Sequence, residues 1–325
     1  MSNVYPSNQS YVGAGEPGVT GPYPTQSGIY TPELFSKKLL IKFYTSTVFG
    51  QIANTDYEGE IRNQGDTVNI RTVPDIAIFD YTRGDLDAPY TPQPGIVPLL
   101  IDKGKAYNVA INDIDIVQAD IAYVNKWAED ASEQMKMAID RDILADIYTD
   151  ADAQNMGNEA GKISGQYALG EAEDPVEITE SNVIEYILRM GAVLDEQDVP
   201  DNDRAIVIPT WMAKLVKNSD LKDASLAGDT RSILRTGIMG TIDRFTMYRS
   251  NNIHSVIDEV VVGSPRCFYP IACHKSALTF ASQFVKNEFL RNQKDFGDLM
   301  RGLQVYGYKV IKPEAMSVGY VTRGS

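Results

Sequence analysis

The sequence predicts an α+β fold in which long strands and one long helix precede a region of alternating helices and strands. Three patterns lead to this prediction. Apolar and polar residues alternate over 66–73 and 97–111, which is the period of a strand with one buried face. Apolar residues recur at intervals of three and four over 114–138, which is the period of a helix. Short helical and strand patterns then alternate between residues 178 and 275.

The composition is that of an ordinary globular protein and excludes several classes. The chain has 325 residues, 43% of them hydrophobic and 23% charged, and its formal net charge is −14. This length allows about two domains with real cores. Sequence-specific reading of DNA is not expected, because phosphate contacts need a basic surface. No stretch approaches the ~18 consecutive apolar residues of a membrane span, and residues 1–30 lack the apolar region of a secretory signal, so we expect a cytoplasmic setting.

Residues 1–31 have the composition of an extended arm. They contain four prolines, five glycines and a single charged residue, Glu16, which does not suit a helix or a central strand. Two interpretations stay open: a disordered tail, or a strap that docks its aromatic side chains on a neighbouring surface. Disordered tails are usually poor in aromatic residues, which favours the strap. Its tyrosines are Tyr5, Tyr11, Tyr23 and Tyr30.

A helix is predicted to follow the arm. Thr31 can cap its first turn, Pro32 suits the first helical position, and Gly50 marks its end.

Residues 59–111 are predicted to form a long two-stranded excursion. Its strands are residues 66–73 and 97–111, and the tip between them, residues 74–96, has the prolines, glycines and acids of a loop. A lone two-stranded ribbon is only marginally stable in water, so it must lie on another surface. That surface can belong to the same chain or to a neighbouring copy. In the second case the ribbon is an assembly device.

The most regular pattern lies over residues 113–149. The apolar spacing runs from Ile114 to Ala138 and continues less strictly through Ile143 and Ile147, which predicts a long helix with a narrow apolar stripe. A coiled-coil seam is one interpretation of the stripe. Its alanines favour instead a helix that lies flat on a sheet, because small side chains permit close approach.

The rest of the chain is predicted to alternate between short elements. A polar connector, residues 150–177, comes first, and the change of pattern after it marks a second domain over about 178–275. We expect helices at 180–197 and 210–218, strands at 204–209, 243–249, 259–262, 277–284 and 305–311, and a charged helical stretch near 286–291.

No catalytic or cofactor-binding motif is recognisable in the chain. It has no phosphate-binding glycine loop, no HExxH, no GxSxG and only two histidines, so we expect no enzyme, no cofactor and no metal. Cys267, Cys273 and His274 could begin a zinc site, but their spacing is not CxxC and no fourth ligand is near. Buried thiols are the simpler interpretation, and two cysteines make no disulfide framework. The acidic run from Asp150 lacks the glycine and glutamate of a calcium loop.

The order of these elements and four stretches of sequence carry a family resemblance. They are GDTVNIR (65–71), RAIVIPTWMAKL (204–215), GIMGTIDRFTMYRSNNI (237–253) and FGDLMRGLQVYGYKVIKPEAM (296–316). The first is similar to the entry of an extended loop, the next two to the run of an axial domain, and the last to closing strands. In these features the chain resembles the major capsid proteins of tailed double-stranded DNA phages, which have the HK97-like fold.

The resemblance implies a division into the domains of that family. It gives an N-terminal arm (1–31), an N-terminal helix region (32–58), an extended β-hairpin loop or E-loop (59–111), a peripheral domain with the long spine helix (112–177 and 276–325) and an axial domain (178–275).

The resemblance also implies a function and a set of partners. The chain would assemble with itself into pentamers and hexamers of an icosahedral head in the virion, around packaged DNA held without sequence specificity, after synthesis in the host bacterial cytoplasm. A portal and, in some members, a decoration protein would join the shell; no membrane is involved. The long N-terminal scaffolding segment of some members is missing, so a separate scaffolding protein is expected. The loop tip has no lysine, so the lysine crosslink of some members is not expected.

The expected contacts between subunits lie in the arm and at the loop tip. They are the four arm tyrosines together with Phe79, Tyr81, Arg83, Leu86 and Tyr90. Two alternatives stay open. One is an encapsulin-like nanocompartment shell, which shares the fold and encloses protein cargo, although the proline-, glycine- and tyrosine-rich arm fits a phage coat better. The other is a soluble acidic α/β enzyme with its site in 178–275, against which the scarcity of histidine weighs.

Overall fold

The computed structural model describes eight segments of the chain. They are residues 47–56, 67–74, 76–80, 91–112, 124–219, 240–261, 263–292 and 296–324. The predictions for the arm, for the helix up to residue 46, for residues 81–90 of the loop tip and for residues 113–123 lie outside the described residues.

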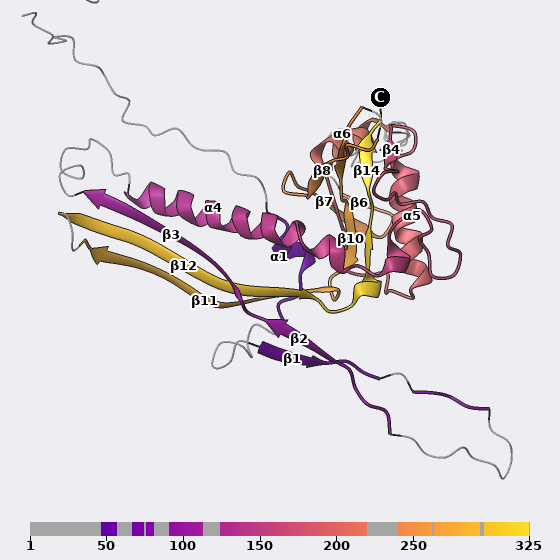
Figure 1. Ribbon diagram of the computed structural model, residues 1–325, viewed down its shortest axis with the longest axis horizontal. Coiled ribbons are helices and arrows are strands. Elements are labelled where there is room, and N and C mark those ends of the chain that lie inside the picture. Colours follow the sequence, from indigo (N-terminus) through magenta and orange to yellow (C-terminus); the bar gives the residue numbers. More distant parts are fainter. Residues whose placement is uncertain are drawn as a thin grey trace, which may run out of the picture. The chain divides into compact units, whose positions relative to one another are not determined.

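One long helix, several shorter helices and many strands make up the described chain (Figure 1). The helices are α1 (Phe49–Ile52), α4 (Val124–Leu144), α5 (Val183–Glu196) and α6 (Thr210–Asn218), with 3-10 turns η1 (Ile147–Asp150), η2 (Ala153–Asn155) and η3 (Pro313–Ala315). The strands are β1 (Thr67–Arg71), β2 (Ile96–Leu100), β3 (Lys103–Asn112), β4 (Val176–Ile178), β5 (Arg204–Ile208), β6 (Thr241–Ile242), β7 (Phe245–Arg249), β8 (Ser255–Ile257), β9 (Arg266–Phe268), β10 (Ile271–His274), β11 (Leu278–Arg291), β12 (Gly297–Val310), β13 (Met316–Val318) and β14 (Val321–Arg323).

The described strands form four sheets. β1 and β2 make a two-stranded ribbon, and β11, β12 and β3 make a three-stranded antiparallel sheet in that order. A five-stranded sheet has the order β13-β10-β5-β7-β6, and a four-stranded sheet has the order β4-β14-β9-β8. None of the helices in the described segments is long and apolar enough to cross a membrane.

The predicted second strand of the excursion is in fact two strands with different partners. β2 pairs with β1, from Thr67 opposite Leu100 to Arg71 opposite Ile96. β3 pairs with β12, from Lys103 opposite Tyr306 to Asn112 opposite Gly297. The alternation of covered and exposed residues continues across the break between them. Periodicity reports which face of a strand is covered, and it does not report the partner strand.

The predicted helical stretch near 286–291 is wrong. These residues continue β11, which pairs with β12 as far as Arg291 opposite Asp298. The charges that indicated a helix lie on strand neighbours: Glu288 stands opposite Arg301 and pairs with it. A cross-strand ion pair therefore accommodates charges in a strand, and pairing along the whole of β12 decides the conformation.

The predicted strand at 259–262 is also wrong where it is described. Residues 259–261 lie in the turn between β8 and β9, and Val260 is 67% exposed. The Asp258 carboxylate accepts a hydrogen bond from the Val260 backbone N–H, which is the short-range bond of an aspartate-initiated turn. This local bond turns the chain despite the strand propensity of consecutive valines.

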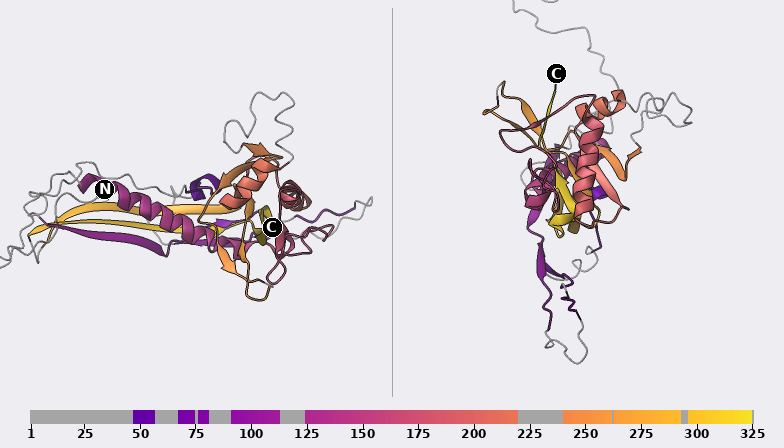
Figure 2. Two further views of the ribbon diagram at one scale, coloured as in Figure 1. Left: turned by 90° about the horizontal axis from the view of Figure 1, so that it is seen from above. Right: turned by 90° about the vertical axis from the view of Figure 1, so that its right-hand side faces the viewer.

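The long helix lies on the three-stranded sheet, as its alanine-rich stripe predicts (Figures 1 and 2). α4 ends at Leu144, and η1 extends the run to Asp150. Met135 in the stripe packs against the main core, and Ile143 and Ile147 are fully buried. The described part of the stripe therefore serves as a helix-on-sheet contact, and the coiled-coil interpretation is not needed.

The main core surrounds the five-stranded sheet. All five residues of β5 are buried. β10 and β7 pair with its two edges, and its apolar side chains share a core with residues of α5 and α6. α5 contributes buried residues at helical spacing, including Val183, Tyr186 and Met190. This sheet also takes in β13 from near the C-terminus, so segments far apart in the sequence share one core.

Candidate subunit-contact surface

The base of the ribbon packs on its own chain. Ile70 of β1 and Leu99 of β2 are buried together with Ile101 and with Ala281 of β11. Gly307 of β12 lies so close to this base that a Cβ on it would stand 2.0 Å from the Leu100 carbonyl oxygen. The ribbon that is marginal by itself is therefore supported at its base by the three-stranded sheet.

The segment that follows β1 exposes a row of large apolar side chains beyond this base. Val73 is 91% exposed, Ile76 69% and Ile78 94%. Ile96, at the start of β2, is 61% exposed. Exposed apolar groups gathered on one projecting segment mark an interaction surface. Each would contribute about 1.5–3 kcal/mol if a partner buried it fully.

Of the nine predicted contact residues, only Phe79 lies in the described part of the chain. Its side chain is 55% exposed. Tyr81, Arg83, Leu86, Tyr90 and the four arm tyrosines lie outside the described residues, so all nine remain predictions. Sequence reasoning missed Val73, Ile76 and Ile78. The alternation of Ile76 and Ile78 was the available signal, and the prolines around them led to a loop assignment.

The three-stranded sheet has two unlike faces. Register places Lys103, Lys105 and Tyr306 on the face toward α4. The opposite face, which we call the outer face, has a shallow hollow of ≈ 510 Å³. The side chains of the outer face that line it are Ala106, Asn108, Lys286, Glu288, Arg301 and Leu303.

The outer face combines small, apolar and charged groups. Arg301 donates two hydrogen bonds to the Glu288 carboxylate, from Nε at 3.0 Å and from Nη2 at 2.7 Å. The hydrogen bonds from Lys286 and Arg301 hold the pKa of Glu288 below its usual value, so this carboxylate stays ionised. Leu303 and Leu290 are 39% and 38% exposed beside these charges. The surface offers apolar contacts with fixed polar groups around them.

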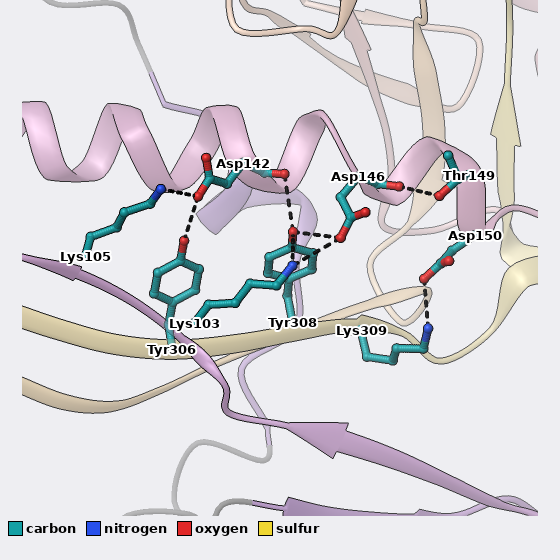
Figure 3. Close-up of polar contacts among 9 residues, drawn as sticks. All are labelled: Lys103, Lys105, Asp142, Asp146, Thr149, Asp150, Tyr306, Tyr308 and Lys309. Atoms are coloured by element: carbon teal, nitrogen blue, oxygen red, sulfur yellow. Dashed lines mark hydrogen bonds and ion pairs between the residues drawn. The ribbon is translucent and has the colours of Figure 1, made fainter.

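The face toward α4 is fastened to the end of that helix by a polar cluster (Figure 3). Lys103 Nζ lies 3.1 Å from Asp146 Oδ2, and the Tyr308 hydroxyl donates to the same carboxylate at 2.9 Å. One turn earlier, Asp142 Oδ2 lies 2.5 Å from Lys105 Nζ and accepts a hydrogen bond from Tyr306 at 3.1 Å. Each carboxylate thus receives one cation and one hydroxyl from the sheet.

Burial and these bonds shift the pKa values of three members of this cluster, Asp146, Tyr306 and Tyr308. Burial raises the pKa of Asp146, but the hydrogen bonds from Tyr308 and Lys103 outweigh it and leave that pKa below its usual value. Burial, and then the neighbouring carboxylates, raise the pKa of Tyr306 and of Tyr308. The tyrosines therefore remain neutral donors and Asp146 a charged acceptor, which suits a structural fastening.

The structure does not group Cys267, Cys273 and His274 as ligands of one metal ion. Cys267 belongs to β9 and Cys273 to β10, in different sheets. Burial raises the pKa of the Cys273 thiol to about 12, so it does not supply a thiolate at neutral pH. His274 Nδ1 lies 2.7 Å from the Ser276 hydroxyl. Within the eight described segments, no three His, Cys, Asp or Glu residues are grouped as metal ligands.

Comparison with protein families gives a match over most of the chain. Residues 98–318 match the family model described as "Phage capsid protein". The chain belongs to this family. The resemblance stated from its sequence motifs is thereby confirmed, and a comparison with curated proteins finds no match.

Solved structures give the same result for the capsid protein's fold. A chain of Mycobacterium phage Che8 is similar with a TM-score of 0.72 and 26% identity, over 89% of this chain and 96% of that one. The capsid of cyanophage P-SCSP1u is similar with a TM-score of 0.69 and 15% identity, over 91% of this chain and 94% of that one. The capsid of cyanophage Pam1 is similar with a TM-score of 0.69 and 12% identity, over 90% of this chain and 96% of that one.

These matches determine the class of the protein. It is a phage major capsid protein with the HK97-like fold, a structural subunit of an icosahedral virion shell. They favour the phage coat over the nanocompartment shell and over the soluble enzyme.

Proposed function

We propose that the capsid protein closes into pentamers and hexamers because its ribbon reaches a neighbouring subunit. The observation that carries this proposal is the apolar row of Val73, Ile76 and Ile78, 69% or more exposed on a segment whose base is firmly packed. A rigid base with an exposed apolar end loses little further freedom on binding, which favours association. The predicted contacts Phe79, Tyr81, Arg83, Leu86 and Tyr90 would extend the same surface.

The outer face of the three-stranded sheet is the surface that suits this row. Its hollow, the exposed Leu290 and Leu303 and the small residues of β3 leave room for aliphatic side chains. Donor and receiving surfaces belong to different elements of one chain, so the contact is heterologous and a fixed rotation closes it into a ring.

The arm and the remaining partners complete the proposal. Tyr5, Tyr11, Tyr23 and Tyr30 would strap the arm onto a neighbour. The shell would enclose double-stranded DNA held without sequence specificity, and the net charge of −14 keeps its surface from binding DNA tightly. A separate scaffolding protein and a portal would act with it, together with a decoration protein of the kind that some members of the family have, after synthesis in the bacterial cytoplasm. The same proposal includes the domain boundaries predicted from the sequence. They are 1–31, 32–58, 59–111, 112–177 with 276–325, and 178–275.

Replacement of one exposed residue tests the proposal. Ile78→Asp should leave a folded subunit and reduce particle yield at least tenfold in cells that supply the other head proteins, because a carboxylate cannot be buried cheaply in an apolar contact. Ile78→Val keeps the apolar surface and should assemble normally. The measurement is electron microscopy and sedimentation of the product, with circular dichroism of the subunit. Normal yield of Ile78→Asp particles would contradict the role of the ribbon.

The content of native particles tests the enclosed partner. Purified particles should contain nuclease-protected double-stranded DNA. Protein cargo without DNA would contradict this part of the proposal.

A further inference from the structure

A tight loop, Ala160–Tyr167, projects from the connector between η2 and β4. Its ends are joined by two backbone hydrogen bonds, from Ala160 N–H to the Tyr167 carbonyl at 3.1 Å and from Tyr167 N–H to the Ala160 carbonyl at 3.0 Å. A third bond joins Gly165 N–H to the Gly161 carbonyl at 3.0 Å. Gly161 has φ +112°, a conformation that suits glycine. The loop therefore has one well-defined conformation.

The last residue of α5 fixes the tip of this loop. The Glu196 carboxylate oxygen Oε2 accepts hydrogen bonds from the backbone N–H groups of Ile163, at 2.8 Å, and Ser164, at 3.0 Å. Its pKa is held below the usual value by these bonds, that from Ser164 first, so the carboxylate is charged at neutral pH. Nevertheless the Ile163 side chain at the tip is 81% exposed. The fold thus builds a rigid support for an apolar side chain that it leaves in water, a typical feature of a preorganised contact.

A hollow of matching character lies near the base of the same connector. Its volume is ≈ 420 Å³, and it is lined mainly by aromatic and apolar residues. The Tyr148 and Tyr269 rings stack with centroids 4.2 Å apart, and Tyr320 lies 4.9 Å from Tyr269, so the aromatic wall is fixed. Met156 and Val318 add apolar surface, and the exposed Glu171 also lines the hollow.

Tip and hollow are complementary in charge as well as in polarity. Lys162, next to Ile163, is the only basic residue between 150 and 177, which hold seven acidic residues. A cation beside an apolar tip thus matches a carboxylate beside an apolar hollow. One chain carries both halves, so copies arranged head to tail can repeat the contact around a ring.

We propose that Ile163 of one copy inserts into the hollow of Tyr148, Met156 and Tyr269 on the neighbouring copy in the ring, with Lys162 paired to Glu171 of that copy. This contact is distinct from the ribbon contact, and it rests on the proposed ring assembly. Because the loop is already ordered, the contact adds affinity with little loss of conformational entropy.

Disulfide crosslinking between copies that carry cysteines at different positions tests this contact. The variants Ile163→Cys and Met156→Cys are co-expressed and assembled into particles, which are then oxidised and analysed on denaturing gels. Covalent dimers should form only when both variants are present. Background should be low because the native Cys267 and Cys273 are buried.

The matched control combines Leu188→Cys, instead of Ile163→Cys, with Met156→Cys. Leu188 is an exposed apolar residue of α5, and this pair of variants should give no dimers. Particles of normal shape that hold both Ile163→Cys and Met156→Cys copies, but no covalent dimers between them, would overturn the inference and leave the proposed ring assembly intact.

Charge reversal supplies an independent test if the cysteine variants do not assemble. Lys162→Glu and Glu171→Lys should each lower particle yield severalfold, and the double variant should restore it. Equal yield for all three would overturn the inference. A yield that stays low in the double variant would overturn it as well, because the two charges would then act separately.

Discussion

The carboxylate of Asp140 accepts a hydrogen bond of 2.7 Å from the side-chain amide of Asn252, 112 residues away in the sequence. Its other oxygen accepts the backbone N–H groups of Val48 and Phe49, each at 2.9 Å. Asp140 is fully buried. Its hydrogen bonds join α4 to the start of α1 and to the segment after β7.

Replacement of this buried carboxylate should be costly. Asp140→Ala leaves three donors without their acceptor, and each buried unpaired donor costs about 1–3 kcal/mol. We expect a loss of about 3 kcal/mol or more in the free energy of unfolding, measured by urea denaturation of the unassembled subunit. Glu133→Ala on the same helix is the control. Among the residues that the structure describes, Glu133 makes only an exposed pair with Lys136, and the replacement should lose about 0.5 kcal/mol or less. Equal effects of the two replacements would contradict the role of Asp140.

The fastening of α4 to the sheet should weaken in acid. The pKa of Asp146 is lower in the folded chain than in the unfolded one, so its contribution is complete above the unfolded value of about 4 and is lost as the pH falls through the folded value. Asp146→Asn should therefore lower stability at pH 7 and change it little near pH 2. Because the Asp146 side chain is 59% exposed, the loss at pH 7 should be about 1 kcal/mol at most. Urea midpoints measured between pH 7 and pH 2 check this, and a pH-independent difference would contradict it.

The close approach of the ribbon base to β12 should not tolerate a side chain. Gly307→Ala would place a methyl group 2.0 Å from the Leu100 carbonyl oxygen, so β2 must move. We expect a loss of about 1–3 kcal/mol from overpacking, measured by thermal or urea unfolding. Gly50→Ala is the control, since α1 is helical there and, in the described part of the chain outside this helix turn, no atom lies within 4 Å of its new Cβ. It should be neutral or slightly stabilising.

The buried Arg204 should be essential to the five-stranded sheet. Its side chain is fully buried, and its guanidinium donates to Asp195 Oδ1 at 2.7 Å and to the carbonyls of Pro200 and Val199 at 2.8 and 2.5 Å. Arg204→Ala removes the donor of the two carbonyls and leaves a cavity, while Asp195 keeps its pair with Arg244. We expect a loss of about 2–5 kcal/mol. Arg204→Met fills the space and should lose less. A larger loss for Met than for Ala, by urea denaturation, would contradict this account.

Local patterns in the chain were sufficient to tell which residues face inward and which family the chain resembles. The alternation around Leu99 and Ile101, and the helical spacing that ends at Ile143 and Ile147, both agree with burial in the structure. These patterns are reliable because they depend only on the geometry of one strand or one helix.

The choice of partners among the elements, in contrast, is visible only in the folded chain. Residues 97–111 divide between the ribbon and the three-stranded sheet, and residues 286–291 follow β12 as a strand. A carboxylate in one element can satisfy donors from elements a hundred residues away, as Asp140 does, and no local pattern records this. Likewise the aromatic hollow beside Tyr148 gathers residues from distant parts of the sequence. Periodicity specifies a face, whereas pairing depends on surfaces that only folding brings together.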